Sequence, residues 1–137
     1  MEEIKWEKEF ETGVNWIDTQ HKNFTQKLKK FNLAIKDNRP TLEVIRILEF
    51  LETYIRSHFN LEEKYMVEYN YPEKKFHMKE HREFIKVFDV LKKDLTGNSK
   101  KTENVLALQY ELWQYFTNHI SIIDSELARF LKSKGAK

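Results

Sequence analysis

The chain has 137 residues, of which 40% are hydrophobic, 34% charged and 14% aromatic, as suits a single globular domain. Three Gly and two Pro are too few for the turns of a many-stranded sandwich or barrel, and the absence of Cys excludes disulfides, thiolate zinc sites and iron–sulfur clusters. A net charge of +2 gives nucleic-acid binding little electrostatic support. No apolar run reaches the length of about 18 residues that a membrane span needs, and the start has no signal-peptide pattern, so we expect a cytoplasmic protein.

Residues 1–17 fit no helical stripe, yet they carry a large apolar surface. Trp6, Phe10, Val14 and Trp16 all fall in this segment. The alternative is a mobile tail, but so many bulky apolar side chains are unusual in a disordered segment. We therefore expect an ordered N-terminal arm that packs along the rest of the domain.

Residues 18–134 are expected to form four amphipathic helices, separated by breaks at residues 38–40, 70–72 and 96–99. Asp18 and Thr41 are expected to cap the first two helices. Connections this short join antiparallel neighbours, so the predicted fold is all-α, an up-down-up-down four-helix bundle in a single domain. The predicted inward stripes are His21, Phe24, Leu28, Phe31 and Ile35; Val44, Leu48, Leu51, Ile55, His58, Glu62, Tyr65 and Tyr69; His77, His81, Phe84, Phe88, Leu91 and Leu95; and Val105, Leu108, Leu112, Tyr115, His119 and Ile122.

All five histidines fall on these inward stripes, together with Glu62. One inward histidine is usually a hydrogen-bonded core residue, but five of them would need five separate buried acceptors. A buried carboxylate needs a positive partner, and no Lys or Arg lies on the same stripes. A bound metal ion would satisfy both requirements. Glu63, the next residue, falls on the polar face and is expected to play no part in metal binding.

The spacing of the candidate ligands supports this interpretation. His58 and Glu62, and His77 and His81, are i,i+4 pairs, which place two ligand atoms one turn apart on the same helix face. His119 and Asp124 are five residues apart, which leaves them about 140° out of line in a regular α-helix. Either the two side chains reach a site from opposite flanks, or a π-type bulge aligns them. Alternatively, Asp124 is a solvated helix residue.

These motifs together resemble the hemerythrin family, in particular its single-domain bacteriohemerythrins. The resemblance rests on HxxxE, HxxxH and HxxxxD in that order, preceded by IDTQHKNF around His21 and by the arm pattern W-x3-F-x2-G-V, and it covers nearly the whole chain. It implies a non-haem centre of two iron ions with an oxo or hydroxo bridge, which binds O2 reversibly. His77, His81 and His119 would hold one iron, His21 and His58 the other, and Glu62 and Asp124 would bridge both.

The donor set favours an oxygen carrier over an enzyme. Two octahedral ions with these ligands and one bridging hydroxide keep one open position, on the iron with two imidazoles, where O2 or a small anion such as azide would bind. Ferritin-like di-iron enzymes use carboxylate-rich sites, whereas nitrogen dominates here. The side chains expected to line a dry O2 pocket, although core packing also explains each of them, are Phe24, Phe59, Phe84, Phe116 and Ile120.

The predicted function is therefore oxygen storage, transport or delivery by a non-enzymatic protein that is expected to be a monomer. Two alternatives remain open from the sequence. The first is a di-iron peroxidase or nitric-oxide-reducing enzyme, which would turn over its substrate with a reductant. The second is an oxygen-sensing module that uses the same site as a switch.

Overall fold

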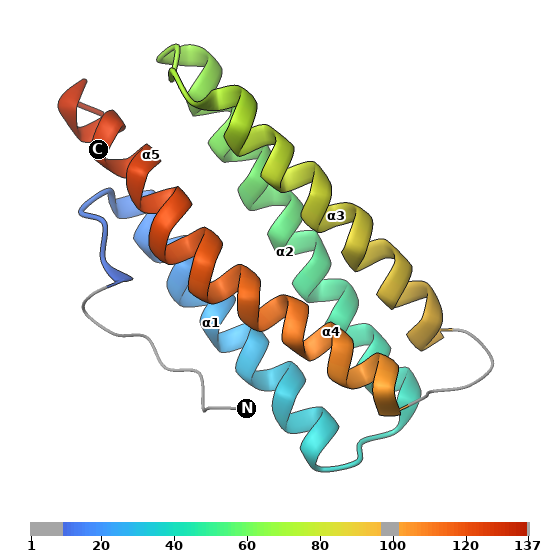
Figure 1. Cartoon of the computed structure of the whole chain (residues 1–137). Coiled ribbons are helices and arrows are strands. Elements are labelled where there is room, and N and C mark those ends of the chain that lie inside the picture. The colour runs from blue at the N-terminus through green and yellow to red at the C-terminus, as the bar shows by residue number, and fades with distance from the viewer. Residues whose placement is uncertain (1–9, 97–101, 137) are drawn as a thin grey trace.

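The computed structural model describes residues 10–96 and 102–136, and within them all regular structure is helical. The first three helices are α1 (Asn15–Lys36), α2 (Thr41–Glu68) and α3 (Lys74–Thr96). The last helix runs without interruption through α4 (Thr102–Gln114), the π-helix η2 (Tyr115–Ile123) and α5 (Asp124–Ser133). Figure 1 shows these helices packed side by side with alternating direction, which confirms the predicted up-down-up-down bundle. No helix in these two described stretches is long and apolar enough to cross a membrane.

The first two helices begin differently from the prediction. Asp18 does not cap α1, because α1 already begins at Asn15. The Asp18 carboxylate instead accepts hydrogen bonds from the amides of Thr12 (2.8 Å) and Gly13 (3.1 Å), and so fixes the turn that leads into the helix. Gly13 has a φ of 84°, in the left-handed region that glycine tolerates best. The prediction for Thr41 was also wrong, since this residue is the first of α2 and its side chain forms no cap.

Two of the predicted breaks are turns closed by asparagine. Asn38 and Asn70 each follow the end of a helix and adopt a φ of 53°, a left-handed conformation that asparagine accepts more readily than most residues. The third break, after Thr96, falls on residues 97–101, which lie outside the described residues.

The N-terminal arm is shorter than predicted, because residues 15–17 belong to α1. Its described part packs on the bundle: Val14 is fully buried and Phe10 contacts the main core. Trp6 and the rest of residues 1–9 lie outside the described residues.

The core consists of two apolar clusters, which lie on either side of the polar residues along α1, α2 and the last helix. The larger cluster contains Phe24, Ile55, Phe59 and Ile120 among its buried members. The smaller one contains Ile17, Met66 and Leu127, with Val14 from the arm. On α1 and α2, for example, His21 lies between Ile17 and Phe24, and Glu62 between Phe59 and Met66. The polar residues are thus shielded from solvent by hydrophobic layers on both sides.

Candidate metal centre

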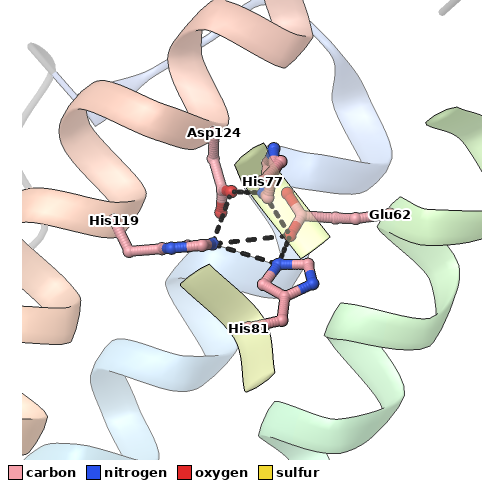
Figure 2. Close-up of side chains that lie close together, drawn as sticks. All are labelled: Glu62, His77, His81, His119 and Asp124. Atoms are coloured by element: carbon pink, nitrogen blue, oxygen red, sulfur yellow. Dashed lines mark hydrogen bonds and ion pairs between the residues drawn. The ribbon is translucent and has the colours of Figure 1, made fainter. Parts of the chain in front are cut away.

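Seven ligand-type side chains meet in the middle of the bundle, and all of them are buried. Every helix of the bundle contributes, so that the cluster exists only once the four helices have packed. Figure 2 shows five of the seven, converging from α2, α3 and the last helix. The set is His21 from α1, His58 and Glu62 from α2, His77 and His81 from α3, His119 from η2 and Asp124 from α5.

The π-helix brings Asp124 into the cluster. Within η2 the wider turn places residues five apart on nearly the same face, and the amide of Asp124 bonds to the carbonyl of His119. Of the alternatives that the sequence left open, the structure therefore selects the π-type bulge. The same change of register turns Ile122 outward, where it is 55% exposed, so its predicted place on the inward stripe was wrong. Asp124 itself is fully buried and not a solvated helix residue.

The two oxygens of Asp124 face two different groups of imidazoles. Asp124 Oδ2 lies 2.9 Å from His21 Nε2 and 3.1 Å from His58 Nε2. Asp124 Oδ1 lies 3.1 Å from Nε2 of both His77 and His119. Grouping by ligand-atom distance gives the same division, with Glu62, His77, His81, His119 and Asp124 in one set and His21, His58 and Asp124 in the other. Asp124 is the member that the two sets share.

Glu62 also faces both groups of imidazoles. Its Oε1 is 3.1 Å from His81 Nε2 and 3.4 Å from both His77 Nε2 and His58 Nε2. Its second oxygen is buried and has no hydrogen-bond partner among the described residues. The position expected of Glu62 from its helical stripe is confirmed, while its role as a ligand stays a prediction.

The spacing of the donor atoms fits bound metal better than it fits hydrogen bonding alone. Adjacent ligands bonded at about 2.1 Å to an octahedral ion lie about 3 Å apart. The separations around Asp124 and Glu62 are close to this value, at 2.9–3.4 Å, except that between His119 Nε2 and Glu62 Oε1, which is 3.8 Å. His81 Nε2 and His119 Nε2 face each other at 3.2 Å. His77 Nε2 and Asp124 Oδ1 are buried without a well-aligned hydrogen bond to any described residue. A metal cation that accepts nitrogen and oxygen ligands would satisfy these atoms.

The electrostatics show that the cluster attracts positive charge. Burial opposes protonation of His58 and His77, but Glu62 and Asp124 outweigh it and raise the pKa of each imidazole to about 10. Burial likewise opposes ionisation of Asp124, yet His119, His21 and His58 hold the pKa of its carboxyl well below the ordinary value. Without metal, the site therefore gathers protons, which a cation would displace on binding.

Two imidazoles of the cluster are held at Nδ1, the ring nitrogen that faces away from the cluster, by residues that were not predicted from the sequence. His81 Nδ1 donates to Glu63 Oε2 at 2.7 Å, and His58 Nδ1 donates to the side-chain oxygen of Gln20. Glu63, which was placed on the polar face, therefore contacts a cluster histidine directly; the expectation that it plays no part in metal binding stays a prediction. Periodicity could not reveal this contact, which depends on how α2 and α3 pack.

Four of the five residues predicted to line an O2 pocket lie in or beside the larger apolar cluster next to the site. Phe59 stacks on His81 with ring centroids 3.8 Å apart, and Phe84 packs edge-on against Phe59 at 5.9 Å. Phe24 and Ile120 are buried in the same cluster, whereas the side chain of Phe116 lies outside the described residues. Whether these residues line an O2 pocket stays a prediction.

Two further aromatic rings contact the cluster but were not predicted as site residues. Tyr115 stacks on His119 with ring centroids 5.1 Å apart. The ring centroid of Trp16 lies 6.4 Å from that of His58, and Trp16 also stacks on Tyr65. The sequence did hold a signal for Tyr115, which precedes His119 by four residues on the same stripe.

The fold and the site define a class of protein: a helical bundle that buries a histidine-rich cation site between two apolar layers. Residues 12–131 match the family described as "Hemerythrin HHE cation binding domain". The chain belongs to this family, which confirms the resemblance seen in the sequence motifs.

Curated relatives agree with this assignment. The chain is 29% identical over 86 residues to the bacteriohemerythrin of Pseudomonas aeruginosa (strain LESB58), a stretch that covers 63% of this chain and 56% of the relative. It is 29% identical over 83 residues to the bacteriohemerythrin of Stenotrophomonas maltophilia (strain R551-3), covering 61% and 54%. The chain thus spans little more than half the length of the relatives that it matches.

Proposed function

We propose that this protein binds two iron ions in the buried cluster and holds O2 reversibly, as an oxygen store or carrier. His77, His81 and His119 would bind one ion, His21 and His58 the other, and Glu62 and Asp124 would bridge the two. When bound, a pair of ferrous ions supplies the electrons by which O2 is held and released.

The observation that carries the proposal is the position of Asp124. One fully buried carboxylate directs its two oxygens at two separate sets of imidazoles. A single-ion site would not need a second set, and a structural carboxylate would not need four imidazole contacts. Two cations that share one carboxylate account for both features.

The surroundings support a carrier more than an oxidising enzyme. Phe59 covers one face of His81, and apolar layers lie at both ends of the site, which limits the access of water and protons. Five neutral imidazoles against two carboxylates give a site that stabilises highly oxidised iron less well than the carboxylate-rich sites of ferritin-like enzymes. In this proposal the histidines and carboxylates hold the ions, and the aromatic rings exclude solvent.

The test is anaerobic loading of the metal-free protein with Fe(II), followed by exposure to air. We expect charge-transfer absorption in the near-ultraviolet and visible range that disappears when oxygen is removed and returns when it is readmitted. Steady consumption of peroxide or nitric oxide with a reductant, without a reversible absorption change, would instead identify an enzyme and overturn the proposal.

A further inference from the structure

The two groups of imidazoles have outer partners of different charge. His81, in the five-residue group, donates from Nδ1 to the Glu63 carboxylate at 2.7 Å. His58, in the group with His21, donates from Nδ1 to the neutral amide oxygen of Gln20. In Figure 2 the His81 ring directs one nitrogen at the cluster and turns the other away from it. Each contact fixes a ring with its Nε2 lone pair facing the centre of the cluster.

These contacts have unequal consequences for the imidazoles. A carboxylate that accepts the Nδ1 proton of a ligand histidine raises its basicity and locks its orientation, and such outer partners typically change metal affinity by about 10- to 100-fold. A neutral amide locks the orientation but adds no negative charge. The Glu63 contact therefore strengthens one group of ligands more than the Gln20 contact strengthens the other.

We propose that Glu63 is a positioning residue that makes the group of His77, His81 and His119 the tighter of two cation subsites, so that this subsite fills first. Gln20 orients His58 at the weaker subsite, which keeps the two positions unequal. This inference rests on the proposed two-ion function and adds an order of filling and a cause for it.

The position of Glu63 makes it suitable for a clean test. Its side chain is 34% exposed and borders a surface pocket of about 480 Å³ between α2 and α3, whose wall also includes Phe59, Asn60 and Ile85. Glu63→Gln keeps the size and removes the charge at a place already open to water. The folded state should therefore tolerate the change without metal.

The experiment is an anaerobic calorimetric titration of the metal-free protein with Fe(II), in wild type and variants. Wild type should show two binding steps, and Glu63→Gln should weaken the tighter step about 10- to 100-fold while leaving the weaker step within about twofold. Gln20→Glu should have the opposite result, strengthening the weaker step and bringing the two affinities together. Glu68→Gln, an exposed change on the same helix, serves as the matched control and should alter neither step.

A second measurement separates positioning from a general effect on folding. Thermal unfolding of the metal-free Glu63→Gln protein should match wild type. In the Zn(II)-loaded protein, which is diamagnetic, the Nδ1–H resonance of His81 should move upfield when the carboxylate is replaced, while that of His58 stays in place.

The outcomes distinguish this inference from the function on which it rests. Wild-type protein that binds no iron, or only one ion, would refute the proposed function. Wild-type protein with two steps that are both unchanged in Glu63→Gln, or both equally weakened along with the metal-free stability, would refute the role of Glu63 and leave the proposed function intact.

Discussion

Asp124→Asn tests the shared carboxylate with the least disturbance of packing. Asparagine has nearly the same size and keeps one side-chain oxygen, so no cavity forms at this fully buried position. The change removes the negative charge that four imidazoles contact at 2.9–3.1 Å. Loss of a proposed direct ligand should weaken metal binding by at least the 100-fold upper end seen for outer-sphere changes. We therefore expect the variant to retain at most one iron per chain.

The magnitude follows from linkage between binding and folding. A cation present at 100 times its Kd stabilises the fold by about 2.7 kcal/mol, and 100-fold weaker binding leaves only about 0.4 kcal/mol. The loss of about 2.3 kcal/mol corresponds to a Tm lower by roughly 10 °C for a chain of this length. Calorimetry with and without Fe(II), together with elemental analysis, measures both effects, and exposed Glu126→Gln serves as the control. Asp124→Asn protein that still holds two irons, with the full metal-induced rise in Tm, would refute the bridging role.

Further changes probe protonation, access and solvent exclusion. The folded-state pKa values of His58 and His77 are raised to about 10, so protonation of these imidazoles stabilises the metal-free fold fully below about pH 6.5. This contribution is lost as the pH rises toward 10. Urea unfolding of the metal-free protein should therefore show a free energy of unfolding that falls between about pH 6.5 and 10. The metal-loaded protein should show the reverse trend and lose iron below about pH 5, as measured by iron released on acid titration, since ligand imidazoles must be neutral; retention down to pH 3 would contradict imidazole ligation. Azide should bind the oxidised protein in a one-to-one ratio at the iron held by two imidazoles, and spectra that place it on the other iron would contradict the predicted open position. Ile120→Trp should slow azide entry in stopped-flow mixing, whereas Phe59→Ala should admit water and hasten autoxidation; unchanged rates would mean that these side chains do not enclose the pocket.

The sequence predicted the bundle and most of the site because both depend on periodicity. A histidine at helical spacing among apolar residues must face the core of an amphipathic helix, and this holds for His21, His58 and His77 alike. The motif spacing then indicated the family before any contact was known. Local rules were less reliable at helix ends. Asp18 and Thr41 are both residue types that can cap a helix, but α1 already begins at Asn15, and Thr41 is the first residue of α2 and forms no cap.

The features that the sequence left undecided depend on departures from regular geometry or on contacts between helices. The position of Asp124 follows from the π-helix, in which the amide of Asp124 donates to the carbonyl of His119. Glu63 has the periodicity of a surface residue, yet the packing of α2 on α3 brings it to His81. Neither outcome can be worked out from one helix considered alone.

The most direct test of the account is to measure O2 and iron together on the same sample. Fe(II)-loaded protein, freed of excess metal, should bind one O2 for every two irons at equilibrium, release it under vacuum and bind it again over repeated cycles. Protein that carries two irons but consumes O2 irreversibly, or that binds O2 with a single iron per chain, would contradict reversible oxygen binding at a di-iron centre.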